Sequence, residues 1–362
     1  MKPIKIIISG GGTGGHIFPA LAIAIEMKKI NLNTSILFVG AKDKMEMEKI
    51  PKAGFLIKGL WISGFQRSLS FKNLLFPLKL VLSIIQAFRI LKKFKPNIVV
   101  GTGGFASGPL LWVAQLLGLP TLLQEQNSYP GFTNRILSKN ANRICVAYDG
   151  MEKFFPKSKI LLTGNPVRSN LVNLISSDKS KKHFDLDPKI KTLVVLGGSL
   201  GSERINELIK SNLDLFDELD LQVLWQCGQL YYEKYKKDAS NKVVIRPFVS
   251  KIEKLYAAAD FIISRAGAGS ISELSCVGKP ILLIPSPNVT ANHQYRNAKA
   301  LVKESAALMV EEKDLEEKFK KCFSLLVSDE STRQELKQNL KRLSRPNATQ
   351  NIIKEIMELN DK

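Results

Sequence analysis

The chain has 362 residues, 44% hydrophobic and 24% charged, which is ordinary for a globular protein large enough to form two domains. Its formal net charge of +20 is uneven: residues 1–164 carry 22 basic and 7 acidic residues, and residues 165–362 carry 31 and 26. No uninterrupted apolar run is long enough to span a bilayer, and the four widely spaced cysteines predict neither a disulfide framework nor a metal site.

The N-terminal residues predict a strand, a glycine-rich turn and a helix, in that order. Residues 4–8 are apolar only briefly before the glycines begin, which favours a first strand over a secretory signal. Residues 10–15 match the G-x-G-x-x-G pattern of dinucleotide-binding folds. That pattern needs an acidic residue at the end of the second strand, and the apolar run 35–39 ends at Gly40 instead. The fingerprint is therefore weak evidence for a dinucleotide.

In residues 55–95, large apolar side chains lie beside basic ones. Ten lysines and arginines, and no acidic residue, lie between Glu48 and Glu125. A patch of this kind suits the interface of an anionic membrane. The residues expected in it are Trp61, Phe65, Phe71, Leu75 and Phe76, together with Lys72, Lys79, Arg89 and Lys92. The alternative is that residues 78–94 form an ordinary core helix whose polar face is basic.

Two further segments of the first half combine a strand with glycines or polar residues. Residues 97–100 predict a strand that leads into a second glycine loop at 101–109. The next strand ends at Glu125, Gln126 and Asn127. In an open parallel sheet, side chains at the carboxyl ends of the strands line the ligand crevice, so we expect these three there. Buried capping of the strand end is the alternative.

The second half repeats this organisation after a hinge near residues 164–166. Residues 191–196 predict a strand, and a third glycine loop follows at 197–202. A fourth loop, residues 265–270, follows the apolar run 261–264. Glycines in such loops let backbone N–H groups approach a ligand closely.

The residues after the fourth loop predict a helix that could bind an anion. Ser270 and Glu273 have the spacing of a capping box, so we expect the helix to begin at Ser270. A helix N-terminus carries unpaired N–H donors and a partial positive charge, which suit a diphosphate. A purely structural role is the alternative for any single turn of this type.

Strands alternate with helices in both halves, which predicts an α/β protein with two Rossmann-like, doubly wound parallel-sheet domains. We expect residues 1–164 to form the first domain and 165–344 the second, with 345–362 a helix that packs back on the first. Two such domains facing each other across a cleft would direct glycine loops from both sides to one ligand. This arrangement favours a nucleotide-sugar transferase over a dehydrogenase.

Seven motifs, in this order and spacing, carry a resemblance to a known family. They are GGTGGHIFPALAIA at 11–24, GTGGFASGP at 101–109, EQNSYPGFTNR at 125–135, GNPVR at 164–168, GGSLGS at 197–202, SRAGAGSISEL at 264–274 and HQYRNA at 293–298. The sequence resembles the MurG family, the peripheral membrane transferases of bacterial cell-wall synthesis. The resemblance covers nearly the whole chain.

The resemblance implies an inverting glycosyltransferase of the GT-B type. Such an enzyme moves N-acetylglucosamine from UDP-N-acetylglucosamine to the 4-hydroxyl of lipid I (undecaprenyl-diphospho-N-acetylmuramoyl-pentapeptide) and so makes lipid II for peptidoglycan. The first domain would bind acceptor and membrane, and the second would bind the UDP-sugar. The implied location is the cytoplasmic face of the plasma (inner) membrane, with other cell-wall synthesis proteins as further candidate partners. No nucleic acid partner and no structural metal are expected, and a divalent cation could at most assist the reaction.

The resemblance also implies roles for individual residues. Around the donor sugar and diphosphate it places Thr13, Gly14, Gly15, Asn127, Arg168 and Ser199. Val249 would hold the uracil through its backbone, and Glu273 would accept hydrogen bonds from the ribose hydroxyls. The nucleotide would be covered by Ala268, Gly269, Ser270, Ile271 and Ser272. His293 and Gln294 would reach the sugar hydroxyls.

Inversion at the anomeric carbon requires a base for the acceptor hydroxyl and stabilisation of the departing UDP. His16 has a suitable intrinsic proton affinity for the base, and Glu125 is the second candidate. The alternative for His16 is a structural hydrogen bond to the backbone. Helix N-termini and Arg168 could stabilise the diphosphate without a structural metal.

Other classes of function are also compatible with parts of the sequence. A GT-B enzyme could act on a different lipid acceptor such as diacylglycerol, although the GGTGGH and EQN motifs argue against it. The basic charge could belong to a nucleic-acid-binding protein, but here lysines flank apolar helix sequence instead of forming an aromatic and arginine-rich surface. A two-domain sensor without catalysis is a third possibility.

Overall fold

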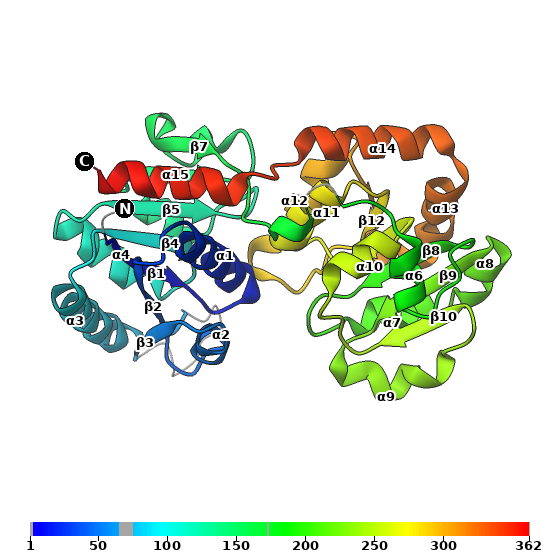
Figure 1. Ribbon diagram of the computed structural model, residues 1–362, viewed down its shortest axis with the longest axis horizontal. Coiled ribbons are helices and arrows are strands. Elements are labelled where there is room, and N and C mark those ends of the chain that lie inside the picture. Colours follow the sequence, from blue (N-terminus) through cyan, green and yellow to red (C-terminus); the bar gives the residue numbers. More distant parts are fainter. Residues whose placement is uncertain (1–2, 65–74, 172–173, 362) are drawn as a thin grey trace. The chain divides into compact units, whose positions relative to one another are not determined.

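The computed structural model describes residues 3–64, 75–171 and 174–361 (Figure 1). It divides into two compact units, Met1–Val167 with Arg345–Lys362, and Arg168–Ser344. The boundary lies three residues beyond the one expected from sequence because Asn165 is bonded into the first unit. Its side-chain amide donates to the carbonyl of Gln126 (3.0 Å) and its oxygen accepts from Gln124 (2.8 Å).

Unit 1 is a seven-stranded sheet with the order β3-β2-β1-β4-β5-β6-β7, and every neighbouring pair is parallel. Its strands are β1 (Lys5–Gly10), β2 (Ser35–Ala41), β3 (Leu56–Leu60), β4 (Ile98–Gly103), β5 (Thr121–Glu125), β6 (Arg143–Val146) and β7 (Ile160–Leu162). Its helices are α1 (Gly14–Ile30), α2 (Glu46–Lys52), α3 (Phe76–Phe94), α4 (Ser107–Leu116), α5 (Phe132–Leu137) and α15 (Ala348–Asn360).

Unit 2 is a six-stranded sheet with the order β10-β9-β8-β11-β12-β13, again with parallel neighbours. Its strands are β8 (Lys191–Leu196), β9 (Leu221–Gln226), β10 (Val243–Arg246), β11 (Phe261–Ser264), β12 (Ile281–Leu283) and β13 (Leu308–Met309). Its helices are α6 (Asp178–His183), α7 (Glu203–Lys210), α8 (Leu213–Glu218), α9 (Tyr232–Tyr235), α10 (Ile252–Ala258), α11 (Ala268–Val277), α12 (His293–Lys303), α13 (Leu315–Ser328) and α14 (Glu330–Leu343). The predicted doubly wound α/β fold is confirmed in both units.

The apolar runs become strands buried on both faces, as parallel sheets require. In β1, Ile6 and Ile8 belong to one hydrophobic cluster, whereas Ile7 between them belongs to the cluster on the opposite face. The last helix, α15, packs against α1 and adds Ile352 and Ile356 to the first cluster (Figure 1). The C-terminal residues therefore complete the core of unit 1.

The strand order reverses at one place in each sheet. In unit 1 the chain moves outward in opposite directions from β1 and β4, and in unit 2 from β8 and β11. Such switch points leave a crevice outside the carboxyl ends of the strands, where ligands bind in open α/β sheets. The four glycine loops read from the sequence follow these four strands, so the fold gathers them in pairs at the two switch points.

Candidate functional site

The first glycine loop joins β1 to α1 and ends at Thr13, the residue that caps the helix. Thr13 has an extended backbone, and its side chain makes no capping hydrogen bond to the helix. The first turn of α1 contains no acidic residue. The turn formed by Thr13, Gly14 and Gly15 therefore keeps the positive end of a 17-residue helix available to an anion.

His16 lies in the first turn of α1 and contacts both glycine loops of unit 1. Its Nδ1 is 3.0 Å from the carbonyl oxygen of Gly11 and 3.3 Å from Oγ1 of Thr13. The imidazole ring lies against the backbone of Gly103 in the second loop, where an added Cβ would be 2.9 Å from Cδ2 of the ring. Gly103 also has a φ of +99°, so only glycine allows both this backbone and this close approach.

Glu125 ends β5 and is buried, with 2% of its surface exposed. Its Oε1 accepts from the backbone N–H of Asn127 (3.0 Å) and from the side-chain amide of Asn127 (3.3 Å). Its Oε2 accepts from the backbone N–H of Gly131 (3.1 Å) and from the side chain of Asn134 (2.9 Å). Because four donors occupy the carboxylate, its geometry is that of a group that shapes the 126–131 loop and orients Asn127.

The third glycine loop, in unit 2, precedes α7 and contains the exposed Ser199. Ser202 caps α7, its Oγ accepting from the N–H of Ile205 at 3.4 Å. Arg265, at the end of β11, donates to Oγ of Ser202 and to the carbonyl of Ile284 (3.1 Å), and it pairs with the carboxylate of Glu312. Arg265 thus ties the third and fourth loops together, a role that the sequence did not reveal.

The helix after the fourth loop begins earlier than its sequence predicts. Gly267, with an extended backbone, caps α11, and its carbonyl accepts from the N–H of Ile271 at 2.9 Å. The expectation that Ser270 is the N-cap is therefore wrong, and Ala268 to Ser272 form the first turn of the helix. Glu273 is too far along the helix for a capping box, and its side chain makes other contacts.

Glu273 is held by two partners within unit 2. Its Oε1 is 3.4 Å from Nε of Arg168, and its Oε2 accepts from the hydroxyl of Tyr256 at 3.4 Å. Burial raises the pKa of the Glu273 carboxyl above its ordinary value, while Arg168 and the Tyr256 hydrogen bond act in the opposite direction. Tyr256 lies in an apolar run of α10, where the sequence marks it only as a core residue. These two contacts orient the Glu273 carboxylate.

Replacing Arg168 with methionine should raise the pKa of Glu273 further, because it removes an opposing cation and leaves the burial. A carboxyl whose folded pKa is raised contributes stability below its unfolded pKa and loses it as the pH rises through the folded pKa. We therefore expect the fall in the free energy of unfolding of unit 2 to extend to higher pH in Arg168→Met. Denaturant titrations from acid to neutral pH measure this free energy of unfolding. Glu273→Gln should remove the part of its pH dependence that comes from Glu273. An unshifted profile in Arg168→Met would contradict the coupling.

The other residues expected at the nucleotide also lie at the carboxyl ends of the unit 2 strands. Val249 is buried, and its N–H donates to Oε1 of Gln226 at 2.9 Å. Oε1 of Gln294 accepts from the N–H groups of Ala266 (3.3 Å) and Ser286 (2.9 Å), so this side chain joins two loops. His293 is the first residue of α12 and is half-buried.

The expected membrane residues lie on or beside α3. The structure describes Trp61, Leu75, Phe76, Lys79, Arg89 and Lys92, whereas Phe65, Phe71 and Lys72 fall outside the described residues. The fully buried residues of α3 are Ser83, Ala87 and Leu91. Its large apolar residues Leu78, Val81, Ile85 and Phe88 are instead between 41% and 54% exposed. Leu80, Ile84, Ile90 and Phe94 pack against the core of unit 1, so α3 carries a second apolar stripe that faces solvent in addition to its core face.

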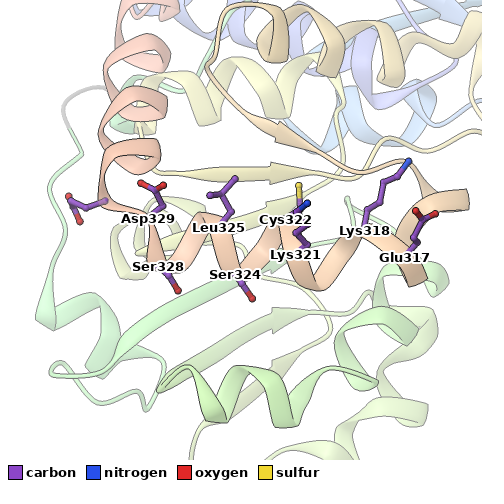
Figure 2. A pocket seen from close by; sticks show the side chains of 9 residues that line it. Glu317, Lys318, Lys321, Cys322, Ser324, Leu325, Ser328 and Asp329 are labelled. Atoms are coloured by element: carbon purple, nitrogen blue, oxygen red, sulfur yellow. The ribbon is translucent and has the colours of Figure 1, made fainter.

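Three other kinds of site could in principle lie among the described residues: a membrane-spanning helix, a metal cluster and a surface hollow. No helix there is both long and apolar enough to cross a membrane. No group of three or more His, Cys, Asp or Glu side chains there could hold a metal ion. The open hollow in Figure 2, lined by α13 residues such as Lys318 and Cys322 and by the start of α14, includes none of the residues expected at the nucleotide. The candidate site is placed at the glycine loops because they follow the strands at the two switch points.

Glu46 is an acidic residue near the first glycine loop that the sequence analysis missed. It is fully buried at the start of α2, and its Oε2 accepts from the N–H of Gly12 at 3.0 Å. The dinucleotide pattern requires an acid at the end of the second strand, where it would bind a ribose. Glu46 follows a short turn later and binds the backbone of the glycine loop instead.

Comparison with known proteins gives matches along the whole chain. The family model described as the Glycosyltransferase family 28 N-terminal domain matches residues 6–146, and the Glycosyltransferase family 28 C-terminal domain matches residues 192–354. The "UDP-N-acetylglucosamine--N-acetylmuramyl-(pentapeptide) pyrophosphoryl-undecaprenol N-acetylglucosamine transferase" of Flavobacterium psychrophilum is 51% identical and is aligned over 99% of this chain and 98% of its own. The protein of the same name from Christiangramia forsetii is 53% identical over 98% of both chains.

Solved structures agree with these matches. The crystal structure of Acinetobacter baumannii MurG is 28% identical, has a TM-score of 0.80, and covers 98% of this chain and 100% of its own. The calicheamicin glycosyltransferase CalG4 has a TM-score of 0.75 at 13% identity over 99% and 98% of the two chains, which shows a shared fold alone.

Proposed function

Because this chain belongs to the MurG family within glycosyltransferase family 28, we propose that it is the N-acetylglucosamine transferase that makes lipid II. It transfers N-acetylglucosamine from UDP-N-acetylglucosamine to lipid I in peptidoglycan synthesis. One observation carries the proposal: about half of the residues are identical, over nearly the whole chain, to those of relatives named for this reaction. The pairing of glycine loops at both switch points supports it, since each pair can bind phosphate groups.

The proposed donor contacts in unit 2 follow from the groups that its loops present. The α11 N-terminus and the guanidinium of Arg168 would bind the diphosphate, and Ser199 would add a hydroxyl. Glu273, oriented by Arg168 and Tyr256, would accept from the ribose. The N–H of Val249 is already bonded to Gln226, so we assign its carbonyl to the uracil. Gln294 would present its amide nitrogen to the sugar, with His293 beside it.

We assign the base to His16 and a positioning role to Glu125. A general base needs a lone pair that can reach the acceptor hydroxyl. The four donors around Glu125 already occupy its oxygens. His16 uses only Nδ1 in its contacts with Gly11 and Thr13, which makes Nε2 the atom for the proton.

We further propose that helix N-termini and Arg168 stabilise the departing UDP without a metal held by the protein. Dipoles and a fixed guanidinium aimed at developing charge lower the barrier without reorganisation. Turnover measured with excess chelator and then with added Mg²⁺ tests this assignment. Full loss of activity in chelator would contradict it.

A product assay tests the function directly. Purified protein with radiolabelled UDP-N-acetylglucosamine should transfer label to lipid I and leave diacylglycerol unlabelled. Mass analysis of the product should show one added N-acetylhexosamine with the lipid diphosphate intact. Label on diacylglycerol would favour the other lipid acceptor, and an intact donor in the presence of lipid I would favour a sensor.

We propose that the α3 face binds the membrane and keeps the enzyme on the cytoplasmic side of the plasma membrane. Its exposed residues Leu78, Val81, Ile85 and Phe88 recur at helical spacing and form one apolar stripe. Arg89 and Lys92 lie at its end, and Nζ of Lys92 is 5.7 Å from the Phe88 ring centroid. Nζ of Lys79 lies 5.6 Å from the Trp61 ring centroid. An apolar stripe bordered by cations suits an anionic lipid surface.

Changing Lys79, Arg89 and Lys92 together to glutamine should weaken binding to anionic vesicles by roughly a hundredfold. This follows from about 1 kcal/mol for each cation near the surface. UDP affinity should not change, because the proposed nucleotide contacts are in unit 2. Vesicle sedimentation and UDP calorimetry measure the two properties. Val81→Glu should also weaken vesicle binding, whereas Leu32→Glu, at an exposed apolar residue elsewhere in unit 1, should not. Equal vesicle binding by all variants would contradict the α3 assignment.

A further inference from the structure

The carboxylate of Glu46 occupies a space that two glycines create beneath the first glycine loop. A Cβ on Gly11 would collide with Oε1 of Glu46, and a Cβ on Gly40 would lie 2.5 Å from its Cγ. The side chain is 0% exposed. Among the described residues, no lysine, arginine or histidine forms an ion pair with it. A buried carboxylate without a cation must be satisfied by hydrogen bonds, so its donors decide what it does.

The two donors to Glu46 are backbone N–H groups at the ends of β1 and β2. Oε1 accepts from the N–H of Ala41 at 3.0 Å, and Oε2 accepts from the N–H of Gly12 at 3.0 Å. The Ala41 bond fixes the carboxylate to the sheet, and the Gly12 bond then fixes the glycine loop. Both bonds are charge-assisted and are therefore stronger than bonds between neutral groups.

The Gly12 N–H and the Gly11 carbonyl belong to one peptide group. That carbonyl oxygen is the atom 3.0 Å from Nδ1 of His16. A carbonyl oxygen can only accept, so this contact requires a hydrogen on Nδ1 and leaves the lone pair on Nε2. Donation from the N–H to a carboxylate polarises the peptide, which makes its carbonyl a stronger acceptor. The carboxylate thus acts on the imidazole through a single amide.

We propose that Glu46 is a positioning residue that fixes the proton-accepting tautomer of His16 through the Gly11–Gly12 peptide. In serine hydrolases a carboxylate does this by direct contact with the imidazole, and here a peptide group lies between the two. The proposal rests on His16 as the base in the proposed function. Without Glu46, the hydroxyl of Thr13, 3.3 Å from Nδ1 of His16, could donate to that nitrogen and favour the opposite tautomer. The base therefore needs this buried acid from another helix.

The tautomer can be read without substrate in the full-length, ¹⁵N-labelled protein. The chain has three histidines, and the His16 signals are identified by their loss in His16→Ala. At about pH 8, where an ordinary histidine is neutral, long-range ¹H–¹⁵N spectra should show His16 with the hydrogen on Nδ1. Glu46→Gln should give a mixture of tautomers. Glu48→Gln, the same change at an exposed residue of the same helix, should leave the spectrum unchanged.

Kinetics give the second readout. Glu46→Gln should lower kcat by about ten- to a hundredfold, as expected for loss of a residue that orients a reacting group, while KM for UDP-N-acetylglucosamine changes little. Glu48→Gln should match the wild type. If Glu46→Gln does not fold, Glu46→Asp provides the test, because its shorter side chain keeps the charge but cannot reach the N–H groups of both Ala41 and Gly12. It should likewise give a mixture of His16 tautomers and a lower kcat, and a wild-type tautomer and kcat in a folded Glu46→Asp protein would contradict the proposal.

Two results would overturn the proposal. One is a wild-type His16 with its hydrogen on Nε2, and the other is a folded Glu46→Gln protein with wild-type tautomer and kcat. Failure of the base assignment is a separate result, because it would appear as normal turnover in His16→Ala whatever the tautomer.

Discussion

Replacing His16 with alanine is expected to lower kcat by about 10²- to 10⁴-fold, the usual contribution of a positioned general base. The acceptor hydroxyl would then have to lose its proton to water. KM for UDP-N-acetylglucosamine should change little, because the proposed uracil, ribose and diphosphate contacts come mainly from unit 2. Initial rates at saturating lipid I, with UDP affinity from calorimetry, separate the two effects. Wild-type turnover in the variant would move the base to another residue.

His183→Ala is the matched control for this prediction. His183 is an exposed histidine of α6, where its ring packs edge-on against Phe184. Its removal should leave both kcat and KM unchanged. A fall in kcat of similar size in both variants would indicate a general effect on folding and not the loss of a base.

Replacing Glu125 with alanine is expected to lower the free energy of unfolding of unit 1 by about 3 kcal/mol, because it removes the buried carboxylate to which four buried or half-buried donors are bonded. Turnover should fall as well, since the 126–131 loop and Asn127 lose their anchor. A catalytic base would behave differently, with turnover lost and stability kept. The variant therefore distinguishes the positioning role from the catalytic one that the sequence left open.

Unfolding of unit 1 can be followed by tryptophan fluorescence in a Trp225→Phe background. Trp225 is the one tryptophan of unit 2, so the remaining signals of Trp61 and Trp112 report on unit 1. Glu152→Ala, at an exposed acid of the same unit, is the control and should leave the midpoint unchanged. An equal stability of Glu125→Ala and Glu152→Ala would contradict the positioning role.

Features that depend on residues close together in sequence were predictable. An apolar run followed by glycines and a helix predicts a phosphate-binding turn, because strand, turn and helix are all encoded locally. The four glycine loops lie where expected, after β1, β4, β8 and β11. The start of α11 predicted from the spacing of Ser270 and Glu273 was wrong, because capping-box residues also occur inside helices. In the structure Gly267 is the N-cap of α11, and Glu273 contacts Tyr256 and Arg168.

By itself the sequence determined the α/β class, the glycine loops, the family and the candidate base, since all of these follow from local patterns and motif order. Only the tertiary structure decided what the isolated acids do. The sequence offered Glu125 as a candidate base and gave no sign of a role for Glu46. Both are buried and accept hydrogen bonds, Glu125 from backbone and side-chain amides of the loop after β5 and Glu46 from two backbone N–H groups, one of them in the first glycine loop. The same holds for α3, because the face of a helix that meets the core depends on its neighbours. Here one apolar face packs inward, and Leu78, Val81, Ile85 and Phe88 remain exposed.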